Sequence, residues 1–394
     1  MSGTDRIVIE GIGVVGGFGG GISDLSRALA GSACAPGTLD FSTGSGSVTI
    51  PAFRADMSRI EEFIPLRTLR RIDRFSRLAL LGSHLALADA ELPEAERPGL
   101  GVIVASGYGA TGMTYAFLKS FIHDGDLCAS PTCFANSVHN SAAAHISIQL
   151  GAMGPSLTVS DFHLSVPSAL ATARLWLSEG RVQRVLFGAV DELSELIGYI
   201  RYRTRDALPS APMAPLRTEM ETSIPAEGAA FLLLARESTS LGGYCTLDAS
   251  TTGSLPIPGF PFPEPGLLVL GADGRRESGR RYAAAARNAR VACYTPVYGS
   301  MPSGPAFDLA AAALILKGGR VFPSPGGAFR DFPATVPVGG ESLGADRVSC
   351  LTLAGDEEYG LTTLGKIPGT NGEWTREERG SPPRNTGYSG TAMR

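Results

Sequence analysis

The sequence predicts an α/β protein in which a mostly parallel sheet is covered by helices on both faces. Two patterns support this prediction. Continuous apolar runs such as 101–107 and 184–192 are typical of strands that are buried on both faces of a sheet. Segments with apolar residues at helical spacing lie between these runs, and strands that alternate with helices favour parallel pairing.

The predicted elements follow this alternation along the chain. Strands are predicted over 6–16, 101–107, 157–160, 184–192 and 227–236, and then over 244–253, 266–272, 347–355 and 359–367. Helices are predicted over 22–32, 65–92, 112–125 and 141–154, after residue 163, and over 279–290 and 304–319. The segment 128–140 is predicted to be a loop, and the polar tail after Lys366 is predicted to be disordered.

Composition excludes several classes of protein. The formal net charge of −4 and the lack of a basic stripe argue against nucleic-acid binding. The sequence has neither an apolar run of about 18–20 residues nor a basic and apolar leader, so we expect a cytoplasmic protein without a membrane partner. The six cysteines are scattered without a Cys-x-x-Cys pair, so we expect neither a metal site nor a disulfide framework. We also expect no cofactor.

A glycine motif near the start of the sequence has the residue spacing of a dinucleotide-binding fingerprint but not its position relative to the next helix. Gly11, Gly13 and Gly16 follow an apolar run with the required spacing, but further glycines delay the next helix to about residue 23. A helix N-terminus therefore does not meet the position of a pyrophosphate. We interpret the motif as a glycine turn.

The segment 154–193 carries the strongest functional signal. A short strand breaks at "DFHLSVPS" and gives way to a helix with small residues, which is a common place to mount a nucleophile. The residue at this turn is His163.

This region and several others resemble the β-ketoacyl synthases of the thiolase superfamily. The resemblance rests on "IEGIGVVGGFGGGISDLSRALAGS", "ASPTCFANSVHNSAAAHISIQLGAMGPS", the turn region, "APLRTEMETSIPAEGAAFLLLAR" and "SGPAFDLAAAALILKGGRVFPSP". It implies a thiolase-like fold of two related βαβαβ halves in a layered α-β-α-β-α arrangement, with the second half abbreviated. The implied domains are a ketosynthase-like half at 1–240, a shortened half at 241–366 and a disordered tail at 367–394.

The chemistry of that family requires a cysteine thiolate at the turn and two histidines from later loops. Here His163 occupies the cysteine position, and none of the five histidines follows it in the chain. The segment that carries one family histidine is represented by "VYGSMPSGPAF". The resemblance therefore implies that no residue is catalytic and that the chain alone does not perform Claisen condensation.

A ketosynthase-like chain without the cysteine resembles the chain-length factor, the inactive partner of a type II ketosynthase heterodimer. The implied partners are an intact β-ketoacyl synthase and an acyl carrier protein, with a polyketide or polyene as the product. The residues implied at the interface or the acyl tunnel are Phe162, His163, Thr132, Cys133, Phe134, Ser137, Val138, Met113 and Phe117. Core packing is the alternative role for Met113 and Phe117.

Two other functions remain open at this stage. The chain could be a structural homodimer of degenerate ketosynthase fold without an acyl tunnel. It could also be a malonyl decarboxylase-like enzyme that uses His163.

Overall fold

The computed structural model describes residues 6–31, 35–125, 127, 129–204, 212–240, 242–257, 266–325, 332–337 and 339–367. The predicted disordered tail lies outside these residues except for its first residue. In the described part of the chain, no helix is long and apolar enough to cross a membrane. No group of three or more His, Cys, Asp or Glu side chains in that part is placed to share a metal ion.

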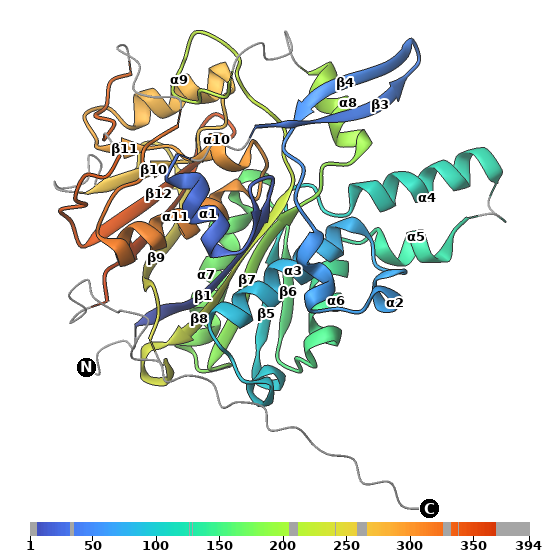
Figure 1. The fold of residues 1–394 in the computed structure, drawn as a ribbon, viewed down its shortest axis with the longest axis horizontal. Helices are drawn as coiled ribbons and strands as arrows, with labels where there is room; N and C mark the ends of the chain where they lie inside the picture. The colour runs from blue at the N-terminus through green and yellow to red at the C-terminus, as the bar shows by residue number, and fades with distance from the viewer. Residues whose placement is uncertain are drawn as a thin grey trace, which may run out of the picture.

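The strands form one large mixed sheet and a separate hairpin (Figure 1). The large sheet follows the order β11-β10-β12-β13-β9-β1-β8-β7-β5-β6, and β2 pairs with β1. The strands of the first half are β1 (Ile7–Gly16), β2 (Gly19–Gly20), β5 (Gly101–Ala105), β6 (Ser156–Val159), β7 (Arg184–Asp191) and β8 (Gly228–Arg236). Those of the second half are β9 (Cys245–Ser254), β10 (Leu267–Leu270), β11 (Val291–Ala292), β12 (Arg347–Ala354) and β13 (Glu358–Gly365). The hairpin pairs β3 (Gly37–Thr43) with β4 (Gly46–Ala52).

The helices include every predicted one and several that the sequence did not indicate. They are α1 (Ile22–Leu29), α2 (Leu66–Leu69), α3 (Arg74–Asp89), α4 (Thr111–Asp124), α5 (Pro131–Asn136), α6 (Ser141–Leu150), α7 (Ser165–Ser178), α8 (Glu195–Arg203), α9 (Arg276–Ala285), α10 (Thr295–Tyr298) and α11 (Gly304–Gly318). The single helix predicted over 65–92 is divided because the Asp73 side chain caps a new helix start by accepting a hydrogen bond from the Ser76 amide. The predicted loop at 128–140 contains α5, which Ser130 caps and which has Pro131 in its first turn.

The expectation of a mostly parallel sheet is wrong. Strand β8 pairs antiparallel with both β1 and β7, and β13 pairs antiparallel with both β9 and β12. Parallel pairing is confined to β5 with β6 and β7, and to β10 with β11 and β12. An apolar run shows that a strand is buried but carries no information about its direction, which explains the error.

Three hydrophobic clusters produce the predicted layers. One face of β5, β7 and β8 packs against α3 and α6, with Phe231 and Phe75 among the buried residues. The opposite face packs against α7 and α11, and these two helices also contact strands of the second half. Helix α9 covers the outer face of β10 and β12 through Tyr282. The two halves of the one large sheet, which join where Val8 and Ile9 of β1 pair with β9, form the two sheet layers, and the order helix, sheet, helix, sheet, helix confirms the predicted α-β-α-β-α arrangement.

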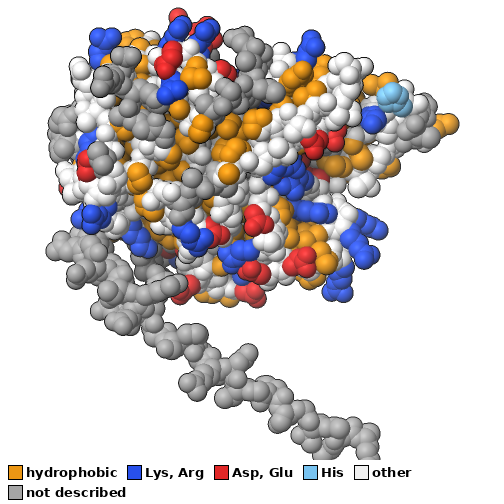
Figure 2. All heavy atoms as spheres, turned by 45° about the horizontal axis from the view of Figure 1, so that its top comes forward, with side chains coloured by type: hydrophobic (Ala, Val, Ile, Leu, Met, Phe, Trp, Pro, Cys, Tyr) orange, Lys and Arg blue, Asp and Glu red, His pale blue; other side chains and the backbone are white. Residues whose placement is uncertain are grey.

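Helices α4 and α5 project from this layered body as an arm (Figure 1). Large hydrophobic side chains are exposed along the arm, namely Tyr115, Leu118, Phe121, Ile122 and Phe134. Figure 2 shows hydrophobic side chains on this projection. Near the base of the arm, β6 forms the end of the sheet and pairs only with β5 among the described strands.

The glycine motif is part of β1 rather than a turn, which corrects our interpretation. A Cβ atom at Gly11 or Gly13 would overlap the backbone of α3, at the carbonyl oxygens of Ala86 and Gly82 respectively. The missing side chains allow α3 to lie unusually close to β1. Close packing of a helix on a strand therefore explains the spacing that resembled a dinucleotide fingerprint.

Candidate functional site: the turn at His163 and the charged pocket it faces

The turn between β6 and α7 holds a strained backbone at its tip. Phe162 has a φ of 42°, in the left-handed region that a bulky residue rarely adopts. The Ser165 hydroxyl fixes the turn, because it accepts a hydrogen bond from the Asp161 amide (2.7 Å) and lies 2.8 Å from the Phe162 carbonyl oxygen. Phe162 is 67% exposed, whereas His163 is only partly accessible. The two residues thus point to different surroundings.

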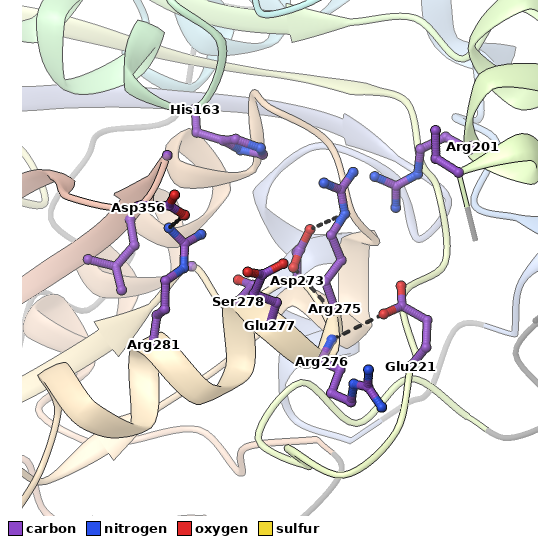
Figure 3. Close-up of a pocket in the computed structure, with 14 residues that line it drawn as sticks. His163, Arg201, Glu221, Asp273, Arg275, Arg276, Glu277, Ser278, Arg281 and Asp356 are labelled. Atoms are coloured by element: carbon purple, nitrogen blue, oxygen red, sulfur yellow. Dashed lines mark hydrogen bonds and ion pairs between the residues drawn. The ribbon is translucent and has the colours of Figure 1, made fainter. Parts of the chain in front are cut away.

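His163 lines a pocket of about 480 Å3 whose other walls come mainly from the second half of the chain (Figure 3). Arginines of α8 and α9 and of the segment before α9 contribute to these walls, namely Arg201, Arg275, Arg276 and Arg281. Burial lowers the pKa of His163 below its ordinary value, with Asp273 acting in the opposite direction. The imidazole therefore faces the pocket as a neutral group at neutral pH.

Asp191, at the end of β7, holds the segments around this turn together. Its buried carboxylate accepts hydrogen bonds from the Ser106 hydroxyl and from the amides of Gly107, Tyr108 and Ser303, at 2.8–3.0 Å. Burial raises the pKa of Asp191 to about 6, and the hydrogen bonds from Tyr108, Ser106 and Ser303 act against that shift. One side chain thus joins the ends of β5 and β7 to the start of α11.

The predicted site residues fall into two groups. His163 is the only one of them that lines the described pocket. Met113 and Phe117 lie on α4, while Thr132, Cys133 and Phe134 lie on α5, with Ser137 and Val138 directly after it. The Phe117 and Phe134 rings pack together with their centroids 5.3 Å apart, and Phe134 remains 59% exposed.

Met113 occupies a different environment from the rest of the arm. Its side chain is partly buried and packs against the hydrophobic cluster beneath α3 and α6. Core packing, the alternative considered for this residue, therefore describes its contacts in the structure.

Glu192 anchors the arm to the sheet. Glu192 directly follows β7, and its buried side chain lies against the first turn of α4, where it accepts a hydrogen bond from the Gly112 amide. Burial raises its pKa to about 7, and the nearby Asp73 and Glu227 carboxylates act in the same direction while Arg74 opposes them. The base of the arm thus contains a carboxyl group that titrates near neutral pH.

Glu192 is expected to make the free energy of unfolding depend on pH. Because its pKa is raised in the folded state, that state binds more protons than the unfolded chain between about pH 4.5 and pH 7. This contribution to stability is therefore present at low pH and is lost as the pH rises through that window, on the order of 3 kcal/mol in total. Denaturant unfolding of the wild type and Glu192→Gln from about pH 5 to about pH 8 should show a flatter profile for the variant. Glu94→Gln, at an exposed ion pair with Arg97, is the control. Parallel profiles for the wild type and Glu192→Gln would contradict the assignment.

The sequence did not indicate the charged residues of the pocket. The sequence analysis names no role for Arg201, and Asp273 and Arg275 fall between the strand predicted over 266–272 and the helix predicted over 279–290. An available signal was the run "DGRRESGRR" directly after a buried strand, because the ends of neighbouring strands gather side chains at one edge of a sheet.

The match to a known domain identifies the family. The β-ketoacyl synthase N-terminal domain matches residues 4–240, which is more than half of the chain. This chain belongs to the β-ketoacyl synthase family.

Curated relatives match part of the chain. The 3-oxoacyl-(acyl-carrier-protein) synthase 2 of Coxiella burnetii is 27% identical over 162 residues, covering 39% of this chain and 38% of the relative. The enzyme of the same name from Vibrio cholerae is 21% identical over 238 residues, covering 58% of this chain and 57% of the relative. The matches thus span less than two thirds of the length of either relative.

Solved structures share the fold over most of the chain. The ishigamide ketosynthase/chain length factor has a TM-score of 0.77 at 16% identity, covering 92% of this chain and 100% of that one. A second similar structure is a type II polyketide synthase acyl-carrier protein in complex with its ketosynthase bound to the hexaketide. The matching chain has a TM-score of 0.72 at 16% identity, covering 92% of this chain and 100% of that one. These similarities confirm the thiolase-like fold class.

Proposed function

We propose that this chain is a non-catalytic chain-length factor. It would pair with an intact β-ketoacyl synthase in the cytoplasm and shape the acyl tunnel while a polyketide or polyene chain grows on an acyl carrier protein. The observation that carries the proposal is the turn between β6 and α7, where a ketosynthase fold presents His163 in place of a cysteine.

The chemistry of the turn supports a non-catalytic role. A condensing enzyme needs a thiolate that accepts the acyl group and donors that stabilise the developing oxyanion. His163 is a neutral imidazole, and the chain has no histidine after it. The segment "VYGSMPSGPAF" instead brings Ser300 to the pocket side, where its hydroxyl lies 3.0 Å from Arg201 Nη2 and 3.2 Å from Asp273 Oδ2.

The surface near the turn supports a partner. Strand β6 lies at one edge of the sheet, and Phe162, which follows β6 in sequence, is exposed. The arm also carries exposed aromatic and aliphatic side chains. Contiguous exposed apolar surface is typical of interfaces between proteins. An intact synthase subunit that covers β6 and the arm would bury these groups.

The arm supplies the candidates for the tunnel wall. Phe134 is our proposed gate, because its ring packs on Phe117 while more than half of it stays exposed. Thr132, Cys133, Ser137 and Val138 would line the tunnel beside it. Phe162 and His163 would lie next to the interface.

Reconstitution with an intact ketosynthase and its acyl carrier protein tests the proposal. We expect a one-to-one complex that condenses malonyl units, and no condensation by this chain alone. A homodimer that does not associate with the synthase would overturn the proposal and favour a structural role. Decarboxylation of malonyl carrier by the chain alone that disappears in His163→Ala would overturn it in favour of an enzyme.

Product length in the same complex tests the gate. Phe134→Ala removes a large ring from the proposed end of the tunnel, so the product should become longer by one or more extension units while the complex still forms. Leu175→Ala is the control, since it truncates an exposed side chain on α7 away from the arm. Unchanged product length with Phe134→Ala would reject Phe134 as the gate.

A further inference from the structure

The pocket in front of His163 has the lining of a site for a charged ligand rather than an apolar one. Arg201, Arg275 and Arg281 face it together with His163 (Figure 3). Its volume of about 480 Å3 lies within the range of small-molecule sites. An acyl chain would gain little from this lining, because apolar ligands are held by apolar walls.

Four carboxylates line the pocket, and the two less exposed ones, Asp273 and Glu221, are already engaged by protein donors, whereas Glu277 and Asp356 are exposed. Asp273 Oδ1 accepts a hydrogen bond from the Arg275 amide, and Oδ2 lies 3.2 Å from both Arg275 Nε and the Ser300 hydroxyl. Glu221 accepts a hydrogen bond from the Arg276 amide at the start of α9. These acids therefore fix the walls of the pocket, and a single carboxylate, that of Asp273, lies beside two inner guanidinium groups.

Arg201 is a buried cation whose charge nearby carboxylates offset only from a distance, without a direct ion pair among the described residues. It is only 5% exposed, and its Nη2 donates to the hydroxyls of Ser223 (2.7 Å) and Ser300 (3.0 Å). No carboxylate within the described residues forms an ion pair with it. Burial and, to a smaller extent, the positive charge of Arg275 lower its pKa, while Tyr108 and the Asp273 and Glu221 carboxylates act in the opposite direction. A buried cation without a directly paired carboxylate is energetically unfavourable, and a bound anion would reduce that penalty.

The geometry points to a binding site for a small organic oxyanion, a carboxylate or a phosphate, between the guanidinium groups of Arg201 and Arg275. Figure 3 shows these groups pointing toward one another at one end of the pocket, with His163 on the neighbouring wall. Guanidinium groups present paired N–H donors that match the oxygens of either anion. The neutral His163 imidazole offers one further polar contact. This site does not depend on the proposed partner role, because it lies within one chain.

Isothermal titration and thermal unfolding of the full-length chain test the site near neutral pH. The probes are malonate and inorganic phosphate, with neutral malonamide and sodium chloride of matched ionic strength as comparisons. Malonate or phosphate should bind in a one-to-one ratio and raise the melting temperature, whereas malonamide and chloride should not. Tighter binding of malonate would assign a carboxylate ligand, and tighter binding of phosphate would assign a phosphate ligand.

Two variants and a matched control locate the binding. Arg275→Gln and Arg201→Met should each weaken the bound anion by about ten- to a hundredfold, as expected for loss of a charged hydrogen-bond donor. Arg347→Gln is the matched control, because Arg347 Nε lies 3.2 Å from Asp248 Oδ2, the same distance as between Arg275 Nε and Asp273 Oδ2, but at an exposed position. This variant should bind the anion as tightly as the wild type does. The proposal is overturned if neither anion binds, if malonamide binds as well as malonate, or if Arg275→Gln and Arg347→Gln have equal affinities.

Discussion

Glu227→Gln is expected to lower the free energy of unfolding by about 3–5 kcal/mol, the usual effect of breaking a buried ion pair from one side. The Glu227 carboxylate is fully buried and lies 3.0 Å from both Arg54 Nε and Arg74 Nε. It also accepts hydrogen bonds from the Ala55 and Leu193 amides, both at 3.2 Å. A neutral amide leaves both guanidinium groups without their counter-charge and turns an NH2 group toward donors.

Denaturant unfolding measures this effect, and Glu62→Gln provides a control with similar geometry. The Glu62 carboxylate also accepts a bidentate pair of hydrogen bonds, from Arg59 Nε (3.0 Å) and Nη2 (2.7 Å), but its side chain is half exposed. The control should lose no more than about 1 kcal/mol because solvent screens an exposed pair. Equal losses in the two variants would show that burial does not determine the strength of the Glu227 network.

Gly13→Ala is expected to lower the free energy of unfolding by about 1–3 kcal/mol or more, as overpacking does in a rigid core. The added methyl group would overlap the Gly82 carbonyl oxygen and the Ala86 amide nitrogen of α3. These are backbone atoms, so relief requires α3 to move away from β1. That movement would loosen the buried residues between α3 and the first half of the sheet.

Gly20→Ala serves as the control for the same residue change nearby. Its Cβ would lie 3.6 Å from Arg59 Cδ, which is ordinary van der Waals contact with a flexible side chain. Thermal and denaturant unfolding should therefore show a much smaller change. If Gly13→Ala were as stable as the wild type, close packing would not explain the glycine spacing of β1.

Local sequence pattern predicted most of the strands and helices, because burial period and helix caps are local properties, whereas the five-layer arrangement was implied by the family resemblance. The apolar runs at β5, β7 and β8 and the glycine-terminated α6 lie where the patterns placed them. Strand direction could not be predicted in this way, since β8 reaches β1 and β7 through contacts between segments far apart in sequence. The short connection between β12 and β13 was an available sign of antiparallel pairing.

Of the candidate site, the sequence predicted only the turn that carries His163. The turn at His163 could be found because a short strand, a break and a small-residue helix follow one another in the chain. The groups opposite it, Arg201 and Asp273, lie 38 and 110 residues further on and converge only through folding. Glu227 lies 173 residues after Arg54 and 153 residues after Arg74, so no local pattern could indicate its importance.

The exposed edge of strand β6 is expected to make this protein prone to aggregation when it is produced alone. As the last strand of the sheet, β6 presents backbone donors and acceptors outward, close to an arm with exposed apolar side chains. Such an edge is a template on which another extended chain can add by hydrogen bonding. Production of this chain without a binding partner should therefore favour precipitation, and simultaneous production with one should increase the yield of dispersed protein.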